Sequence, residues 1–574
     1  MTTPPLQRLG DARPNRLKGS RRRDLLQGLA GNDWLWGGEQ NDILSGGAGQ
    51  DWLDGGAGAD LMVGDSGNDV YSLDSRQDQI SEQAGQGRDR IRSTISLALI
   101  QDIEELELLG VQPLTGVGNS GSNLLIGNQA SNSLVGLAGN DRLMGMSGDD
   151  RLVGDGKGNQ PFAGKVGKDR MLGGAGDDTY YVNHVADRVI ELADQGRDTV
   201  ISNLSTYTLP KQVESLILFE KSGNSAAVGN ALDNEILGNQ GDNHLEGLDG
   251  DDTLDGGAGQ DQLVGGLGND RYFVDDPADR VLELSDQGVD SVISRAASYS
   301  LSDQVEQLYL ADNAGDISGN GNGLDNSLLG NDGQNVLDGQ VGNDTLDGGA
   351  GRDRLIGGLG DDRYLVDDPQ DEIFELSDQG LDLVLSQTSY TLPDQVEQLF
   401  LQGDTPLAGT GNSLDNLLSG NESDNILTGE AGNDRLIGRG GNDTLTGGAG
   451  EDLFFYAMPD DQSFAAQAFG VDTITDFRSD RNLIVLSKRT FGLSSNVSEQ
   501  GTVGFSVFNE FASVTDDQAA ALSSARIVFS RDSSKLFYNP NQSEAGFGAT
   551  GASGAFVQFQ NVTTLIFFDF AIVN

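Results

Sequence analysis

The sequence predicts an all-β protein: a parallel β-solenoid in which arrays of nine-residue units alternate with wider β-rungs, closed by a carboxyl-terminal β-rich cap. Two observations carry this prediction. Residues 28–72 read as five consecutive units, GLAGNDWLW, GGEQNDILS, GGAGQDWLD, GGAGADLMV and GDSGNDVYS, each with Gly first and Asp sixth. The segments between arrays alternate apolar and polar residues at a period of two, which is typical of strands with one buried face.

The composition agrees with stacked repeats and restricts the partners. In 574 residues there are 82 Gly and only 36% hydrophobic residues, which suits repeats better than a globular core. The net charge of −53 repels nucleic acid phosphates and anionic membranes and attracts divalent cations. We therefore expect no nucleic-acid partner and no membrane insertion, and no segment reaches the roughly 20 apolar residues of a membrane span. Cysteine is absent, which excludes thiolate metal sites.

The amino-terminal residues 1–27 are basic and lack an apolar run of the length that a secretory signal requires. We expect a short, solvated and disordered tail here. Its charge could dock on the acidic remainder of the chain, which is a simpler interpretation than nucleic-acid binding.

A longer repeat organises the chain after residue 27. An Asp-Gln-Gly triplet recurs at residues 194–196, 286–288 and 378–380, and Gly-Gln-Gly at residues 85–87 takes the equivalent place in the first copy, so four copies of a compound unit follow one another. Each copy joins an array to a segment of alternating strands, and the predicted boundaries are 28–117, 118–228, 229–320 and 321–410. A fifth array at 411–455 precedes the cap at 456–574. The last unit of each of the first four arrays carries a tyrosine at its apolar position, where a larger ring would fill a widening core: Tyr71, Tyr180, Tyr272 and Tyr364.

The glycine-aspartate half of each unit has the chemistry of a calcium site. Calcium takes six to eight hard oxygen ligands from carboxylates and backbone carbonyls, and Gly tolerates the positive φ that turns successive carbonyls inward. If two units make one rung, aspartates eighteen residues apart meet on one edge. Asp and Asn also favour turns without any metal, but the register across five arrays favours calcium. The predicted pairs are Asp33 with Asp51, Asp42 with Asp60, Asp51 with Asp69, Asp252 with Asp270, Asp344 with Asp362, and Asp434 with Asp452.

These arrays resemble the hemolysin-type calcium-binding repeats of the RTX family over nearly the whole chain after residue 27. The resemblance implies that the first six residues of each unit form an ion-binding turn, with Ca2+ between a unit and the next but one. It also implies backbone carbonyl ligands from Gly46, Gly47, Gly49 and their counterparts. The implied carboxylate ligands are Asp33, Asp42, Asp51, Asp60, Asp69, Asp141, Asp150, Asp169, Asp178, Asp252, Asp261, Asp270, Asp344, Asp353, Asp362, Asp434, Asp443 and Asp452.

Two departures from the pattern predict weaker sites. The stretch 154–163 has ten residues and no aspartate at the expected place, which predicts a bulge or an empty site. The first two units of the third, fourth and fifth arrays have a neutral amide at the sixth position, and we expect hydrogen-bonded Asn ladders there. These residues are Asn234, Asn243, Asn326, Asn335, Asn416 and Asn425.

The carboxyl-terminal residues suggest export. Asp569, followed by the apolar residues 570–573, resembles the uncleaved signal that a type I exporter reads in RTX exoproteins. The resemblance implies type I secretion machinery as a partner and an extracellular or cell-surface location.

The predicted function is that of a secreted calcium-binding protein that folds outside the cell. It would serve as a structural, surface-associated or adhesive rod, with cell-surface polysaccharide or self-association as its contacts. We expect no enzymatic activity, because the two histidines form no HExxH motif and no GxSxG elbow occurs. The alternative is a polysaccharide-acting enzyme or its calcium-bearing module, with Trp34, Trp36 and Trp52 as candidate sugar contacts. A pore-forming toxin is disfavoured because no apolar or amphipathic membrane-inserting segment precedes the repeats.

Overall fold

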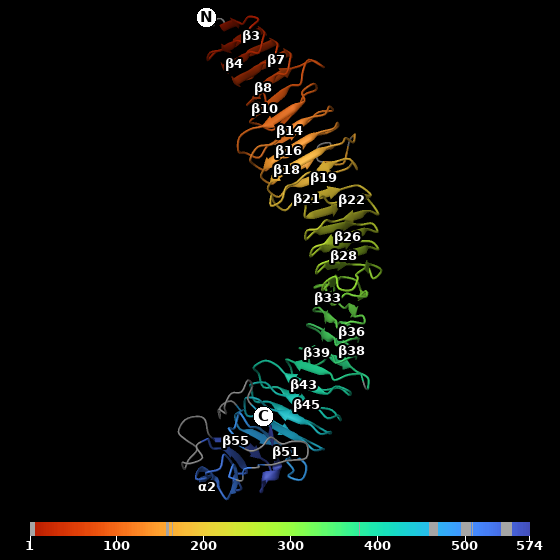
Figure 1. Ribbon diagram of the computed structural model, residues 1–574, viewed down its shortest axis with the longest axis vertical. Helices are drawn as coiled ribbons and strands as arrows, with labels where there is room; N and C mark the ends of the chain where they lie inside the picture. The colour runs from red at the N-terminus through yellow and green to blue at the C-terminus, as the bar shows by residue number, and fades with distance from the viewer. Residues whose placement is uncertain are drawn as a thin grey trace. The chain divides into compact units, whose positions relative to one another are not determined.

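The computed structural model describes residues 6–156, 160–163, 165–377, 379–457, 469–494, 505, 507, 509–540 and 554–573. Asp378 of the third Asp-Gln-Gly triplet lies outside these residues, as do parts of the predicted cap at 458–468, 495–504 and 541–553. The chain divides into two compact units, Met1–Asp290 and Ser291–Asn574. Each unit is a parallel β-solenoid, which confirms the predicted fold class (Figure 1).

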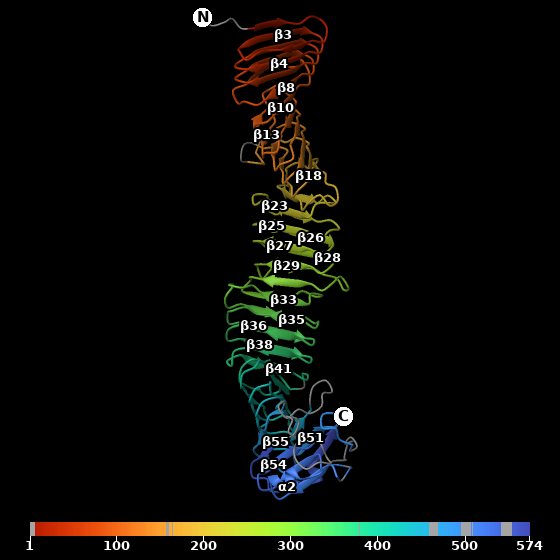
Figure 2. The same cartoon turned by 90° about the vertical axis from the view of Figure 1, so that its left-hand side faces the viewer.

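Each nonapeptide folds as one short strand and one turn. The apolar residue at the eighth position points into the core, so that Leu35, Leu44 and Leu53 are fully buried while their neighbours along the strand face outward. Leu35 pairs with Leu53, and Leu26 pairs with Leu44, eighteen residues apart. Two units therefore make one rung, as predicted, with strands alternating between two facing sheets (Figure 2).

The first compact unit, Met1–Asp290, contains four series of paired strands. One series is β1 (Leu6–Leu9), β3 (Asp24–Ala30), β5 (Ile43–Ala48), β7 (Leu61–Ser66) and β9 (Gln79–Ser81). The facing series is β2 (Arg16–Lys18), β4 (Trp34–Glu39), β6 (Trp52–Ala57), β8 (Val70–Leu73), β10 (Arg90–Ser93), β12 (Glu105–Leu108), β14 (Leu124–Ile126), β16 (Arg142–Ser147), β18 (Arg170–Ala175) and β20 (Arg188–Val189). A third series is β11 (Leu97–Ala98), β13 (Thr115–Val117), β15 (Ser133–Val135), β17 (Arg151–Val153), β19 (Thr179–Val182), β21 (Thr199–Ser202), β23 (Ser215–Leu218), β25 (Glu235–Asn239), β27 (Thr253–Gly257) and β29 (Arg271–Val274). The fourth is β22 (Thr206–Thr208), β24 (Ala226–Val228), β26 (His244–Asp249), β28 (Gln262–Leu267) and β30 (Arg280–Val281).

The second compact unit, Ser291–Asn574, contains three more series of paired strands. One is β31 (Ser291–Ser294), β33 (Gln307–Leu310), β35 (Ser327–Leu329), β37 (Thr345–Asp347), β39 (Arg363–Val366), β41 (Leu383–Ser386), β43 (Gln398–Leu401), β45 (Leu417–Ser419), β47 (Arg435–Ile437), β49 (Leu453–Tyr456), β51 (Leu483–Ser487) and β56 (Phe570–Val573). Another is β32 (Ser298–Ser300), β34 (Ser318–Asn320), β36 (Val336–Val341), β38 (Arg354–Leu359) and β40 (Glu372–Phe374). The last, in spatial order, is β42 (Tyr390–Thr391), β44 (Ala408–Thr410), β46 (Ile426–Thr428), β48 (Thr444–Thr446), β50 (Asp472–Ile474), β55 (Gly554–Phe559), β54 (Lys535–Tyr538), β53 (Ile527–Ser530) and β52 (Phe511–Val514).

The segments between arrays form rungs of unequal length. After the first array, Ile91 pairs with Tyr71, which is twenty residues earlier, and with Leu106, which is fifteen residues later. The second unit repeats these intervals where β41 pairs with β39 and with β43. The alternating segments between arrays do form strands, as predicted, and β30, β31 and β33 are examples. The boundaries proposed between compound units stay predictions.

The expectation of a disordered amino-terminal tail is wrong for residues 6–27. Strand β1 pairs with β3, and β2 pairs with β4, in the register of the later rungs. The reason is that residues 10–18 and 19–27 are two further units with Gly first, Asn15 or Asp24 sixth and Leu17 or Leu26 eighth. Arginines hide the repeat in the sequence, because they occupy the fourth position of both units, where the regular units have Gly, as well as variable positions.

Ten additional residues interrupt the second array without disturbing its strands. Leu143 pairs with Met171 and Leu152 pairs with Tyr180, so the rung interval rises from eighteen to twenty-eight. The extra residues lie inside a single unit, which begins at Gly154 and resumes at Lys165. The predicted bulge is therefore present, as a loop between the first and second positions of that unit.

The described residues of the cap contain strands β50–β56 and two short helices, α2 (Asp517–Ala521) and η2 (Phe567–Asp569). Strand β54 pairs antiparallel with both β53 and β55, which ends the parallel stacking. Aromatic rings fill its core, and the ring centroids of Tyr456 and Phe491 each lie 5.3 Å from that of Phe556. In the described part of the chain, neither helix has the length or apolar character needed to cross a membrane.

Candidate metal centres

The aspartates at the sixth position stack in columns along the turns. The backbone N–H of Asp33 donates to Oδ1 of Asp51 at 2.7 Å, and that of Asp51 donates to Oδ1 of Asp69 at 2.8 Å. The five aspartates of the first array are only 1–3% exposed. The structure thus brings together the aspartates predicted to pair. The other predicted pairs have the same bond: Asp42 to Asp60 at 2.6 Å, Asp252 to Asp270 at 2.7 Å, Asp344 to Asp362 at 2.7 Å, and Asp434 to Asp452 at 3.2 Å.

In most of these carboxylates the second oxygen is buried and has no hydrogen-bond partner among the described residues. An unsatisfied carboxylate oxygen in a protein interior is costly unless a proton or a cation neutralises it. Asp452 differs, because its Oδ2 accepts a hydrogen bond of 2.9 Å from Asn482. The aspartates with an unpartnered Oδ2 are Asp33, Asp42, Asp51, Asp60, Asp69, Asp141, Asp150, Asp169, Asp178, Asp252, Asp261, Asp344, Asp353, Asp362, Asp434 and Asp443.

Backbone carbonyl oxygens crowd the same space between rungs. A Cβ atom at Gly28 would lie 2.3 Å from Oδ2 of Asp33 and 2.6 Å from the carbonyl oxygen of Gly46. A Cβ atom at Gly67 would lie 1.4 Å from the carbonyl oxygen of Gly49. Gly47 has a φ of +105° and faces the carbonyl oxygen of Leu29 in the rung before it. Only glycine leaves room for these oxygens, and the oxygens are the ligands that calcium prefers.

The carboxylates hold their protons more tightly than carboxylates in water. Burial raises the pKa of Asp42 to about 7, and the hydrogen bond from the Asp24 N–H only partly opposes the shift. Burial likewise raises the pKa of Asp51 to about 6 and that of Asp252 to about 8. Neighbouring aspartates in the column add to each shift by like-charge repulsion. The columns therefore need positive charge at neutral pH.

The asparagine rungs are built differently from the expected ladders. The Asn335 amide donates to the carbonyl oxygen of Ile317 at 3.0 Å, and the Asn416 amide donates to that of Val396 at 3.2 Å. The side-chain N–H groups therefore bond the backbone of the preceding rung rather than a stacked Asn. These carbonyl oxygens thus accept hydrogen bonds from the Asn amides, and no cation is needed to satisfy them.

Sequence reasoning missed residues that continue the aspartate columns outside the regular arrays. Asp24 donates its N–H to Asp42 at 2.6 Å, Asp60 donates to Asp78 at 3.1 Å, and Asp443 donates to Asp472 at 3.0 Å. The interval of eighteen residues identifies Asp24 and Asp78. Asp472 follows an interval of twenty-nine residues and carries no such signal.

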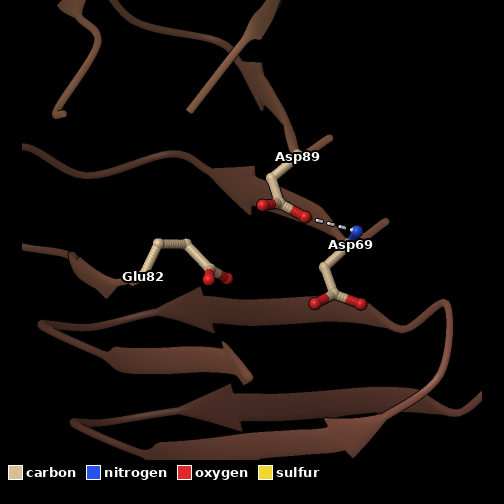
Figure 3. Close-up of side chains that lie close together, drawn as sticks. All are labelled: Asp69, Glu82 and Asp89. Atoms are coloured by element: carbon tan, nitrogen blue, oxygen red, sulfur yellow. Dashed lines mark hydrogen bonds between the residues drawn. The ribbon is translucent and has the colours of Figure 1, made fainter. Parts of the chain in front are cut away.

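Four further acidic clusters lie where the arrays end. In the first, carboxylate oxygens of Asp69, Glu82 and Asp89 lie within 4.8 Å of one another. Figure 3 shows the side chain of Glu82, the residue after β9, reaching toward the two aspartates. The hydroxyl of Tyr71, the residue expected only to fill the core, donates to Glu82. The other clusters are Asp178, Glu191 and Asp198; Asp270, Glu283 and Asp290; and Asp362, Glu375 and Asp382.

The tryptophans of the first array lie on the outward face of β4 and β6. Trp34 is 46% exposed and its ring centroid lies 5.3 Å from that of Trp52, with which it pairs in register. Arg16 stands over the Trp34 ring and Lys18 over the Trp36 ring. The rings therefore pack on one another and on basic side chains.

The fold and its carboxylate-lined turns define a calcium-binding β-solenoid repeat protein. Eight segments match the family of RTX calcium-binding nonapeptide repeats, and the first match begins at residue 9, in agreement with the rungs before residue 28. Over these segments the chain carries RTX calcium-binding nonapeptide repeats. No curated protein matches it. The matching segments are residues 9–44, 36–71, 117–152, 155–183, 237–272, 320–364, 410–445 and 419–454.

Proposed function

We propose that this protein is secreted, that it folds outside the cell when calcium occupies its turns, and that it serves as a non-enzymatic structural, surface-associated or adhesive element. One observation carries the proposal: in the paired columns of buried carboxylates, sixteen of the eighteen predicted aspartates keep an Oδ2 without a hydrogen-bond partner among the described residues. Carboxylate and carbonyl oxygens are the donor set that calcium takes. The proposed ligands are the eighteen aspartates predicted from the sequence, with carbonyls of the class of Gly46, Gly47 and Gly49.

Calcium binding and folding would be one transition. Bound calcium supplies the positive charge that lets neighbouring carboxylates stay ionised at neutral pH. Without it, the net charge of −53 and the buried aspartates oppose the compact state. Sites of this kind in extracellular modules bind calcium at roughly 10⁻⁴ to 10⁻³ M. A calcium-poor cytoplasm would then keep the chain unfolded and competent for export.

The carboxyl-terminal segment supports export before folding. Residues 570–573 form β56, which pairs with β51. Asp569 is buried and accepts hydrogen bonds from the Ser479 hydroxyl and from the Ile566 N–H. A type I exporter could therefore engage this segment only while the chain is unfolded.

The first test removes calcium from the purified full-length protein. Circular dichroism should show loss of β structure after exhaustive chelation and its return when calcium is restored. The double substitution Asp51→Asn and Asp69→Asn should raise the calcium concentration needed for half-folding. Asn substitutions at the exposed residues Asp74 and Asp312 change the charge equally and serve as matched controls. An unchanged β spectrum in the chelated protein would refute the proposal.

The second test concerns location and activity. Cells grown with external calcium should retain the folded protein outside or on their surface, and cells grown without it should release an unfolded, protease-sensitive chain. The alternative function predicts turnover of uronate-containing polysaccharides by the purified, calcium-loaded protein. Such turnover would replace the structural role with an enzymatic one. Calcium-dependent self-association or retention on the surface would support the structural role.

A further inference from the structure

The acidic clusters at the ends of the first four arrays share one sequence rule. In a regular rung, the residue eighteen positions after the first Gly of a unit is another Gly, as Gly46 follows Gly28, and its carbonyl oxygen faces the earlier glycine. At the end of an array this place is taken by a glutamate. The pairs are Gly64 with Glu82, Gly173 with Glu191, Gly265 with Glu283, and Gly357 with Glu375.

The glutamate brings its carboxylate to the place of the missing carbonyl. A Cβ atom at Gly64 would lie 2.2 Å from the Tyr71 hydroxyl, 2.3 Å from Oδ2 of Asp69 and 2.5 Å from Oε1 of Glu82. The arrangement recurs at Gly357, where a Cβ would lie 2.1 Å from Oδ2 of Asp362. A carboxylate, a phenol and a second carboxylate therefore converge above each of these glycines.

In each glutamate, one carboxylate oxygen is hydrogen-bonded and the other has no hydrogen-bond partner among the described residues. Oε1 of Glu375 accepts the Tyr364 hydroxyl and, at 3.2 Å, the N–H of Gly357. Its Oε2 has no hydrogen-bond partner among the described residues, although Glu375 is only 8% exposed. Oδ2 of Asp362, which is 1% exposed, is likewise unpartnered in the described structure. Asp382 completes the cluster, and its Oδ1 accepts the Asp362 N–H at 2.8 Å.

We propose that each of these four junctions is a separate divalent-cation site, selective for calcium, that the nonapeptide motif does not encode. The ligands are the glutamate, the last aspartate of the array and the first aspartate of the following rung. This inference rests on the proposed calcium binding of the arrays. An all-oxygen set suits calcium, and an added carboxylate raises affinity because ligand charge tunes calcium binding. The junctions therefore fill before the regular turns. The tyrosine is a positioning residue, because its hydroxyl fixes the glutamate.

The end of the fifth array provides an internal comparison. Phe454 takes the place of the tyrosine there and has no hydroxyl. The N–H of Gly447 donates at 3.0 Å to Asp476, which is twenty-nine residues later, and no glutamate occupies the eighteenth position. Among the described residues, the three-carboxylate cluster occurs only at the first four junctions. The expected number of such sites is therefore four per chain.

The experiment counts these sites in the full-length protein. Equilibrium dialysis with calcium compares wild type with a variant that carries Glu→Gln at residues 82, 191, 283 and 375. A control variant carries Glu→Gln at the exposed residues 220, 422, 430 and 451, which loses the same charge. The junction variant should bind four fewer calcium ions per chain than wild type and the control. Equal numbers in a folded junction variant would overturn the proposal.

A second measurement does not depend on the folding of that variant. Terbium(III) replaces calcium and emits when an adjacent tyrosine is excited, so each junction carries its own sensitiser. A control variant carries Tyr→Phe at residues 71, 180, 272 and 364. The difference in terbium emission between wild type and this variant should saturate at four equivalents of terbium, before the regular turns fill. An excess that is absent, or that grows only as the regular turns fill, would refute early filling of the junctions. Absence of any calcium binding would instead refute the proposed function, so the two failures are distinguishable.

Discussion

Two glycines with nearly the same φ allow two causes of instability to be distinguished when glycine is replaced by alanine. One cause is the left-handed backbone, and the other is the lack of space between rungs. Gly56 has a φ of +79° and Gly85 a φ of +76°. A Cβ at Gly56 would lie 2.3 Å from the carbonyl oxygen of Gly38, whereas a Cβ at Gly85 would meet nothing within 4 Å. Replacement by alanine therefore strains the backbone equally at both positions but drives a methyl group into a turn only at Gly56.

The magnitudes follow from these distances. A left-handed alanine costs roughly 1–2 kcal/mol at either site. Ordinary contact begins at 3.4 Å, so at Gly56 the rungs must separate by 3.4 − 2.3 = 1.1 Å. That is roughly a quarter of the ~4.8 Å strand spacing, and overpacking of this kind adds about 1–3 kcal/mol. We expect a loss of ~2–5 kcal/mol for Gly56→Ala and only ~1–2 kcal/mol for Gly85→Ala.

Urea unfolding in excess calcium measures both losses, and calcium titration measures the effect on binding. Gly56→Ala should also raise the calcium concentration for half-folding, because it displaces the Gly38 carbonyl from its turn. Gly85→Ala should leave that concentration near the wild-type value. Equal unfolding midpoints and equal calcium midpoints for the two variants would refute the reasoning about oxygen-lined turns.

Three further predictions concern protons, the inserted loop and the asparagine rungs. Burial raises the pKa of Asp69 from 3.8 to about 7, so its contribution to stability is present below pH 3.8 and is lost as the pH rises through 7. Chelated protein should therefore gain β structure by circular dichroism between pH 8 and pH 5, and the opposite trend would contradict the assignment. Deletion of residues 155–164 should leave the β spectrum unchanged, because it joins Gly154 to Lys165 and restores the five-residue interval from Gly154 to Asp169. It should alter calcium binding at most next to Asp169, since it also removes the buried Asp155, whose Oδ2 accepts the Gly167 N–H at 2.7 Å. Unfolding on deletion would show that the inserted residues are structural. Asn335→Asp should bind additional calcium by dialysis and be less stable than wild type without it, because a carboxylate would face the Ile317 carbonyl oxygen that the amide now bonds.

The period of the sequence was sufficient to predict the fold and the main columns of aspartates. A unit that repeats every nine residues fixes both the strand direction and the partner eighteen residues away, since each rung repeats the one before it. The pairing of Asp33 with Asp51 follows from that interval alone. The same reasoning failed before residue 28, because the arginines around Asp24 replace the glycines that make the repeat visible.

The junction glutamates escaped prediction for a physical reason. Glu283 and Glu375 occur once per compound unit, and in the sequence such a recurrence indicates a structural position rather than a metal ligand. Their role depends on contact with a glycine of the preceding rung, which lies eighteen residues earlier in the sequence and on a different strand. The aspartate that completes each cluster follows at an interval of twenty residues, as in Asp69 and Asp89. A strict nonapeptide pattern contains neither residue.

The insertion after Gly154 shows that the length of one turn can change while the rungs on either side stay in register. The sequence has ten additional residues after Gly154, yet Asp141 still donates its N–H to Asp169 at 2.7 Å, and Asp150 donates to Asp178 at 2.6 Å. The turn after Gly154 is thus a place where new chain has been added while the aspartate columns beside it keep their hydrogen bonds. The repeat that sets the metal chemistry can in this way carry a varied outer surface, so that recognition can change over evolution while ion binding stays the same.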